Sequence, residues 1–144
     1  MTFKTYKLKI NIFTLFPKIF QSYLSFGVIA RAFEKDICQL NLVNIRDYAT
    51  DRRQNVDDYP FGGGAGMILR PDIIGNAIDA QKLDLKRTKF VITSPRGKKF
   101  DQKMSINLSK ESEISILCGR YEGIDQRVIE EYQMEEISVG DYIL

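Results

Sequence analysis

The sequence predicts an α/β fold in which a mostly parallel sheet is flanked by helices. Segments that alternate apolar and polar residues with a period of two are separated by segments of helical periodicity, the pattern of βαβ units. Glycine-containing turns follow several expected strands, as in open sheets that bind ligands at their carboxyl edge. With 144 residues, 44% of them hydrophobic and 28% charged, the chain suits one globular domain with a sizeable core.

The N-terminal part of the chain is expected to start with a strand and to end in a long loop. Residues 8–13 alternate and predict the first strand, and a proline-initiated helix is expected over residues 17–24. Helical turns over residues 28–33 and a strand over residues 38–45 follow. Residues 46–69 show neither period, and structureless loops of about 20 residues in compact domains are usually functional or disordered.

The C-terminal part is expected to alternate helices and strands. We expect helices over residues 71–81, 101–108 and 124–132, strands over residues 90–92 and 114–118, and a further strand that starts at Ile137. A loop over residues 93–97 is expected to terminate the strand over residues 90–92.

The composition restricts the chemistry. The chain has no histidine, which excludes Ser-His and Cys-His catalysis and His-based metal sites. Cys38 and Cys118 lie in separate apolar segments and are interpreted as buried thiols, not as a bridge or a metal site. Apolar runs stay shorter than the roughly 20 residues of a membrane span, and no signal sequence is apparent, so a cytoplasmic protein without a transmembrane helix is expected.

The charge distribution is a weak functional signal. The net charge of +2 is too small to indicate nucleic-acid binding by itself. Basic residues gather in residues 82–89 and 96–103, and carboxylates gather in residues 122–136. Solvated surface faces are the interpretation that we favour for these clusters.

The glycine-rich run over residues 59–67 does not fit the common phosphate-binding loops. A Walker A loop requires Gly-Lys-Ser/Thr at its end, but Met67 and Ile68 follow Gly66. The dinucleotide fingerprint also fails, because it requires a glycine at position 67. Two interpretations remain: a loop whose backbone approaches a ligand or polynucleotide closely, or a mobile connector.

Three loops at expected strand ends are better candidates for a binding site: residues 93–97, 119–123 and 139–142. In a parallel sheet all three reach the same carboxyl edge and converge on one pocket. Gly119, Gly123 and Gly140 leave the backbone free to face a flat ligand such as adenine. Glu122 either holds a cationic group or stabilises the following helix N-terminus, and Asp125 is interpreted as a charge that caps this helix.

Six motifs, in their order and spacing, resemble the bacterial tRNA (guanine-N(1))-methyltransferase family, TrmD, of the α/β-knot SPOUT methyltransferases. The resemblance covers the chain from about Lys9 to Leu144. The motifs are Phe16-Pro17, Val56-Asp57-Asp58, Gly62-Gly63-Gly64-Ala65-Gly66-Met67, Ser94-Pro95-Arg96-Gly97, Cys118-Gly119-Arg120-Tyr121-Glu122-Gly123-Ile124-Asp125 and Ser138-Val139-Gly140-Asp141-Tyr142.

The resemblance implies a fold, a cofactor and a substrate. The fold would be a SPOUT-type trefoil-knot methyltransferase domain that works as a homodimer, with the knot incomplete in this chain. S-adenosylmethionine would be the methyl donor, Mg²⁺ would assist, and the product would be 1-methylguanosine at position 37 of tRNA. The implied cofactor contacts are Thr93, Ser94, Pro95, Gly119, Tyr121, Glu122, Gly123, Val139, Gly140, Tyr142 and Leu144. The implied tRNA contacts are Arg52, Arg53, Gly62, Gly63, Gly64 and Gly66.

The chain departs from the family at its end. Members of the family continue past the equivalent of Leu144 with a knot-completing helix, a linker that carries the catalytic Asp and an Arg, and a helical tRNA-binding domain. Residues 1–144 are therefore expected to be the S-adenosylmethionine-binding domain, with the C-terminal tRNA-binding domain absent. Removal of the guanine N1 proton requires a general base, for which Asp125 and Asp141 are the local candidates from chemistry alone. The resemblance instead places this base beyond Leu144, so we expect the chain alone to bind the cofactor without methylating.

Two alternatives remain at this point. The chain could be a non-catalytic RNA- or nucleotide-binding α/β domain, although glycines at all three loops favour a cofactor pocket. It could also be a piece of a longer polypeptide.

Ile92 stands where members of the family often have Tyr, a small change in the expected pocket wall.

Overall fold

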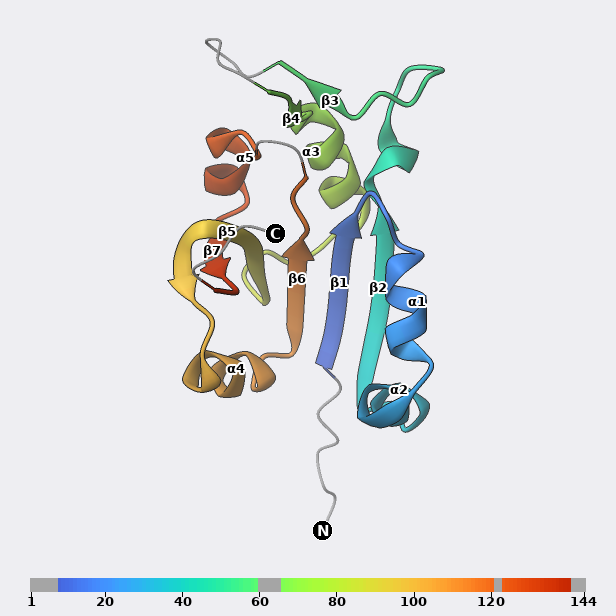
Figure 1. The fold of residues 1–144 in the computed structure, drawn as a ribbon, viewed down its shortest axis with the longest axis vertical. Coiled ribbons are helices and arrows are strands. Elements are labelled where there is room, and N and C mark those ends of the chain that lie inside the picture. The colour runs from blue at the N-terminus through green and yellow to red at the C-terminus, as the bar shows by residue number, and fades with distance from the viewer. Residues whose placement is uncertain (1–7, 60–65, 121–122, 141–144) are drawn as a thin grey trace.

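The computed structural model describes residues 8–59, 66–120 and 123–140. A five-stranded sheet has the order β2-β1-β6-β5-β7, and every neighbouring pair in it is parallel (Figure 1). Its strands are β1 (Leu8–Thr14), β2 (Cys38–Asn44), β5 (Thr88–Lys99), β6 (Glu113–Leu117) and β7 (Glu135–Ser138). The predicted α/β fold with a mostly parallel sheet is therefore confirmed.

The other elements connect these strands. They are the helices α1 (Ile19–Leu24), α2 (Gly27–Glu34), α3 (Pro71–Ala80), α4 (Gln102–Ser109) and α5 (Gln126–Glu131), the 3-10 helix η1 (Ile45–Tyr48), and the antiparallel pair β3 (Asp57–Asp58) and β4 (Ile68–Leu69). The expected long loop over residues 46–69 thus contains a 3-10 turn and two short strands. Most expected elements are present with bounds that differ by at most two residues at either end.

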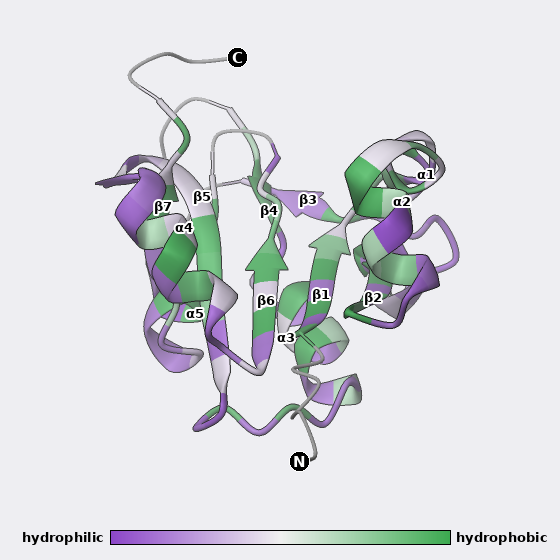
Figure 2. Ribbon diagram, turned by 90° about the horizontal axis from the view of Figure 1, so that it is seen from below, coloured by the Kyte–Doolittle hydropathy of each residue, from purple (hydrophilic) through white to green (hydrophobic). Residues whose placement is uncertain are grey.

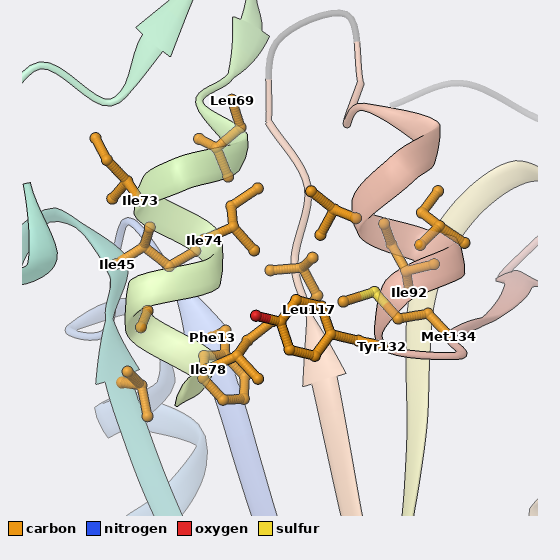
Figure 3. Packing of buried hydrophobic residues seen from close by; sticks show 14 of the residues in the cluster. Phe13, Ile45, Leu69, Ile73, Ile74, Ile78, Ile92, Leu117, Tyr132 and Met134 are labelled. Carbon is orange, nitrogen blue, oxygen red and sulfur yellow. The ribbon is translucent and has the colours of Figure 1, made fainter. Parts of the chain in front are cut away.

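The two faces of the sheet bury separate apolar clusters. On one face, Phe13, Ile92 and Leu117 of the strands pack against Ile74 of α3 and Tyr132 after α5 (Figure 3). On the other face, a smaller cluster contains Val91, Ile114 and Ile137, against which α4 packs through Met104 and Leu108. Adjacent residues such as Val91 and Ile92 belong to opposite clusters because side chains alternate along a strand.

The starts of three helices follow their sequences. Pro71 occupies the first turn of α3, where its missing N–H costs nothing. Asp101 caps α4 by accepting a hydrogen bond from the Met104 N–H at 2.8 Å. Asp125 caps α5 by accepting one from the Arg127 N–H at 2.9 Å, which confirms its predicted capping position.

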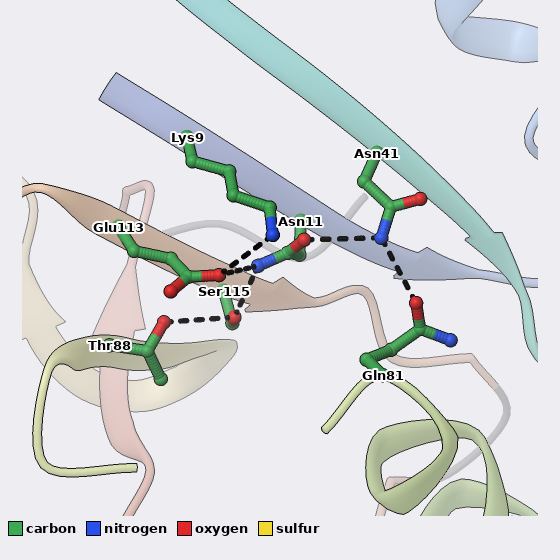
Figure 4. A network of polar contacts seen from close by, with 7 residues as sticks. All are labelled: Lys9, Asn11, Asn41, Gln81, Thr88, Glu113 and Ser115. Carbon is green, nitrogen blue, oxygen red and sulfur yellow. Dashed lines mark hydrogen bonds and ion pairs between the residues drawn. The ribbon is translucent and has the colours of Figure 1, made fainter. Parts of the chain in front are cut away.

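A buried polar network crosses the sheet near its amino edge (Figure 4). The Asn11 side chain, fully buried, donates to Glu113 Oε1 at 2.8 Å and to Ser115 Oγ at 3.1 Å, and accepts from Asn41 Nδ2 at 3.2 Å. Asn41 also donates to Gln81 at 3.1 Å, just after α3. The network therefore ties β2, β1 and β6 together through side chains as well as through backbone ladders.

The structure corrects the predicted end of the fifth strand. The strand expected over residues 90–92 extends as β5 from Thr88 to Lys99 and contains the segment that was expected to be a loop. Thr93 and Lys98 both lie opposite Ile137 of β7, so residues 94–97 form an insertion within the strand. Pro95 and Gly97 are typical of loops, but here they occupy a bulge.

The helices α1 and α2 lie beside β2 at one edge of the sheet (Figures 1 and 2). Apolar side chains of this segment are exposed. Ile19, Tyr23, Phe26, Val28 and Ile29 are 51–80% exposed. The longest helix within the described ranges has 10 residues, and none there is both long and apolar enough to cross a membrane.

Candidate functional site

A cavity of about 280 Å³ lies at the carboxyl edge of the sheet, between β5, β6 and α5. Its volume is near the lower limit for small-molecule pockets, which is roughly 300 Å³. The lining residues are Ile92, Thr93, Ser94, Pro95, Arg96, Gly119, Gly123, Ile124, Ile129 and Glu136. Two of the three predicted loops therefore meet at one cavity, as their place at the ends of parallel strands predicts.

The bulge in β5 forms one wall of this cavity. Within it, Ser94 Oγ accepts a hydrogen bond from the Arg96 N–H at 3.2 Å, which folds the bulge on itself. Gly97 packs so closely on β7 that a Cβ atom there would lie 2.4 Å from the backbone carbon of Glu136. Only glycine fits this contact, which fixes the bulge and the cavity wall relative to β7.

The segment after β6 forms the opposite wall. Gly123 has a φ of +136°, a backbone conformation that residues with a Cβ rarely adopt. A Cβ at Gly119 would meet Ile124 Cδ1 at 3.8 Å, an ordinary contact, so Gly119 is not required for packing. Because neither glycine carries a side chain, backbone groups face the cavity.

The same segment is joined to the flank of the glycine-rich run. Leu69 of β4 forms a parallel bridge with Ile124, and the Leu69 N–H donates to the Gly123 carbonyl at 3.3 Å. Ile124 therefore precedes α5 and pairs with β4, so this helix begins two residues later than predicted, although Ile124 still packs against the larger apolar cluster. The pairing brings Gly66, which is exposed with a φ of +86°, to the carboxyl side of the sheet.

Arg52 and Arg53 lie in a turn before β3 and are exposed. They do not line the cavity within the described part of the chain. Arg46 donates to the Gln54 carbonyl at 3.1 Å, a contact that joins this turn to η1. Arg120, directly after Gly119, places its guanidinium 5.1 Å from the ring centroid of Phe16 after β1, which is favourable for a cation–π contact.

The third predicted loop contributes less to the cavity. After β7, Ser138 Oγ accepts from the Gly140 N–H at 3.3 Å and donates to the Gly140 carbonyl at 2.9 Å, so the chain turns immediately. Val139 is 56% exposed and Gly140 is buried, and neither lines the cavity among the described residues. Instead, β7 contributes Glu136.

Seven predicted site residues lie outside the described ranges: Tyr121, Glu122, Tyr142 and Leu144 of the cofactor set, and Gly62, Gly63 and Gly64 of the tRNA set. Asp141, one of the two candidate bases, also lies outside these ranges.

Sequence reasoning did not assign Arg96, Ile124, Ile129 or Glu136 to the site. Arg96 lies within a predicted loop, but the sequence indicates Glu136 only as part of an acidic surface cluster. The sequence contains one signal for Glu136, because this carboxylate directly precedes the apolar Ile137. Neighbouring residues of a strand point to opposite faces, so Glu136 is expected on the face of the sheet opposite to Ile137. Which face meets a cavity depends on the pairing of β7 with β5, which one sequence does not reveal.

Asp125 is a poor candidate for a general base. Arg127 donates to its carboxylate through Nε and a terminal nitrogen, at 3.0 and 2.7 Å. The side-chain hydrogen bond from Arg127 lowers the pKa of Asp125, so the carboxylate is a weaker base than usual.

The cysteines and the acidic side chains provide no metal centre within residues 8–59, 66–120 and 123–140. Cys38 and Cys118 are free thiols, as predicted, but both are half-buried instead of fully buried. Burial raises the pKa of the Cys118 thiol, which favours its protonated, unreactive form.

Comparisons with known proteins extend over almost the whole chain. Residues 8–144 match the family model described as tRNA (Guanine-1)-methyltransferase TrmD. The tRNA (guanine-N(1)-)-methyltransferase of Wolbachia pipientis subsp. Culex pipiens (strain wPip) is 47% identical over 94% of this chain and 58% of its own length. The protein of the same name from Wolbachia sp. subsp. Brugia malayi (strain TRS) is 50% identical over 94% of this chain and 57% of its own length. The one from Ehrlichia canis (strain Jake) is 48% identical over 95% of this chain and 58% of its own length. The chain thus spans somewhat more than half the length of these relatives.

Proposed function

The chain belongs to the tRNA (guanine-1)-methyltransferase TrmD family, and we propose from this membership that residues 1–144 are the S-adenosylmethionine-binding part of a tRNA (guanine(37)-N(1))-methyltransferase. The whole enzyme would transfer a methyl group from S-adenosylmethionine to guanosine at tRNA position 37. The observation that carries the proposal is the cavity at the carboxyl edge of the sheet, where the β5 bulge faces Gly119 and Gly123.

The residues around the cavity fit this cofactor chemically. Ile92, Pro95 and Ile129 offer apolar surface to a flat purine ring, and backbone groups beside Gly119 and Gly123 are accessible for hydrogen bonds. Thr93 and Ser94 add hydroxyl groups at the same wall. Tyr121, Glu122, Val139, Gly140, Tyr142 and Leu144 complete the proposed cofactor set.

We place the tRNA on the neighbouring surface that carries the glycine-rich run. The bridge between Leu69 and Ile124 supports this placement, because it joins the flank of that run to the segment that walls the cavity. Arg52 and Arg53 are exposed and suit phosphate groups of RNA. The proposed tRNA contacts are Arg52, Arg53, Gly62, Gly63, Gly64 and Gly66.

The chemistry divides between this chain and the rest of the enzyme. S-adenosylmethionine supplies an activated methyl group on a sulfonium, so alignment of that methyl with guanine N1 provides much of the rate acceleration. The walls of the cavity would provide this alignment. The N1 proton must leave during attack, and the pKa of Asp125 is lowered by Arg127, so we assign the base to an Asp beyond Leu144.

The proposed assembly is a homodimer in the cytoplasm, with Mg²⁺ as an assisting ion. The exposed apolar side chains of α1 and α2 support self-association, since apolar surface of this extent often marks an interface. The α/β-knot would be completed by residues that follow Leu144, and a C-terminal tRNA-binding domain would belong to the further length of the relatives.

Isothermal titration calorimetry with S-adenosylmethionine tests the cofactor assignment. We expect saturable binding to the folded chain, and a folded sample that releases no heat and shows no thermal shift with the ligand would refute it. The alternative, a non-catalytic RNA-binding domain, predicts RNA binding without cofactor binding. A methylation assay on tRNA with guanosine at position 37 should show activity only in a version extended past Leu144, whereas activity in the short chain would show that the base lies within it.

A further inference from the structure

One acceptor in the cavity wall has no hydrogen-bond donor. Glu136 Oε2 is buried and makes no hydrogen bond with any residue that the structure describes. Its ion-pair contact is Arg96 Nε at 3.8 Å, which is too long for a hydrogen bond. A buried carboxylate oxygen in this state costs free energy, and such an atom in a native fold requires an explanation, of which a functional role is one.

The position of this carboxylate is fixed by the fold. Gly97 lies in close contact with the backbone at Glu136 and Ile137, and β5 pairs with β7 on the far side of the bulge through Lys98 and Lys99. The neighbouring Glu135 points to the other face of the sheet and forms an ion pair with Lys89. Glu136 is therefore the carboxylate that β7 presents to the cavity, and it is held there before any ligand arrives.

We propose that Glu136 is a positioning residue whose carboxylate accepts a hydrogen bond from an N–H group of the methyl donor. This inference rests on the proposed function, because it takes S-adenosylmethionine as the ligand of the cavity. A carboxylate only accepts hydrogen bonds, so its partner must be a donor. The α-ammonium and the adenine amino group each carry more than one N–H, so either can bond Oε2 and a loop carbonyl at the same time.

Arg96 has a supporting role in this arrangement. Its side chain is 74% exposed and lies at the same wall, so its guanidinium supplies positive charge beside Glu136 without occupying the acceptor. The oxygen thus keeps an unused acceptor site. A shorter Arg96–Glu136 contact would have satisfied the carboxylate within the protein.

The test compares Glu136→Gln with wild type by calorimetry, using four ligands. These are S-adenosylmethionine, S-adenosylhomocysteine, 5′-deoxy-5′-methylthioadenosine, which lacks the α-ammonium, and S-inosylhomocysteine, which lacks the adenine amino group. Glu135→Gln is the matched control, because it removes a neighbouring carboxylate that does not line the cavity. Circular dichroism confirms that each variant is folded.

We expect Glu136→Gln to weaken S-adenosylmethionine and S-adenosylhomocysteine by about 10- to 100-fold, as for a lost hydrogen bond to a charged group. The loss should disappear for the one analogue that lacks the bonded N–H, which identifies the donor. An equal loss of affinity for all four ligands, or no loss for any of them, overturns the proposal about Glu136. Binding of S-adenosylmethionine to the wild-type protein would still support the proposed function. If wild type binds none of them, both fail. If Glu136→Gln does not fold, the affinities of the wild-type protein for the four ligands are compared instead. The proposal then requires that one of the two analogues that lack an N–H group binds at least tenfold more weakly than S-adenosylhomocysteine. Equal affinities for these ligands overturn the proposal.

Discussion

Asn11 is the residue on which the polar interior of the sheet depends. The amide group of its side chain forms hydrogen bonds with Glu113, Ser115 and Asn41, which come from the two strands that flank β1. Each of these contacts requires one register between neighbouring strands, because a shift by one residue would turn Asn11 to the other face. A buried amide thus favours the observed register over its alternatives.

The Asn11→Ala variant should lower the free energy of unfolding by about 1–3 kcal/mol, because Glu113, Ser115 and Asn41 lose a buried partner together. Chemical denaturation monitored by circular dichroism measures the change. Asn107→Ala on the exposed side of α4 is the control and should alter stability by no more than about 0.5 kcal/mol. Equal effects of the two substitutions would contradict the importance of the network.

Asp125 predicts a pH dependence of stability. The side-chain hydrogen bond from Arg127 lowers its pKa in the native state, so the ionised form stabilises the fold. This contribution is complete above the ordinary Asp pKa of about 3.9 and is lost as the pH falls through the lower native value. Asp125→Asn retains a good helix cap but lacks the charge.

We therefore expect wild type to be more stable than Asp125→Asn at pH 7 and the difference to shrink below about pH 4. Denaturation curves of both proteins from pH 2 to pH 7 measure this. A difference that stays constant over the whole range would show that the ion pair with Arg127 does not contribute.

At the scale of elements, the bulge in β5 differs most from the prediction. The residues Thr93-Ser94-Pro95-Arg96-Gly97 are typical of a loop, and by local propensity alone the strand should end at Ile92. The strand resumes because Lys98 and Lys99 pair with Ile137 and Ser138 of β7. This pairing is a tertiary interaction and leaves no periodic signal in residues 93–99.

Gly97→Ala should destabilise the protein by about 1–3 kcal/mol, the usual range for overpacking, because the new Cβ would overlap the backbone of Glu136. It should also weaken ligand binding, since the bulge would move relative to β7. Thermal denaturation and calorimetry measure the two effects. Gly119→Ala is the control for stability, because its Cβ would make only an ordinary contact with Ile124, and an equal loss there would argue against the overlap at Gly97.

The sequence was informative where local chemistry decides the structure. The alternation over residues 8–13, the proline at the start of α3 and the capping Asp125 all predicted features that the structure contains. The sequence was uninformative where distant segments meet. Neither the pairing of Leu69 with Ile124 nor the place of Glu136 in the cavity wall follows from local pattern, because both depend on strand order.

At the scale of the whole molecule, the apolar faces of α1 and α2 remain without a covering layer in the described chain. Phe26 and Val28 are 79% and 80% exposed. Both helices lie beside β2, at the opposite edge of the sheet from β7 and its carboxylate Glu136. A second copy that covers this face would bury apolar side chains and add surface to the edge of the molecule.

The double variant Phe26→Ser, Val28→Ser should shift the protein from dimer to monomer at micromolar concentration, because it removes two apolar side chains from the proposed interface. Sedimentation velocity measures the change. Phe100→Ser, a substitution of another exposed aromatic residue after β5, should leave the dimer intact. A wild-type protein that sediments as a monomer would refute the proposed homodimer.

The place of β6 between β1 and β5 also has a consequence for biosynthesis. Asn11 and Glu113, partners across β1 and β6, are 102 residues apart in the chain. At translation rates of roughly 5–20 residues per second, about 5–20 s separate the synthesis of these two strands. During this interval β1 can pair with β2, but its other edge has no strand partner. This unpaired edge of the nascent chain can pair with a wrong strand or bind a chaperone. Closure of the sheet therefore has to wait until β6 has been synthesised.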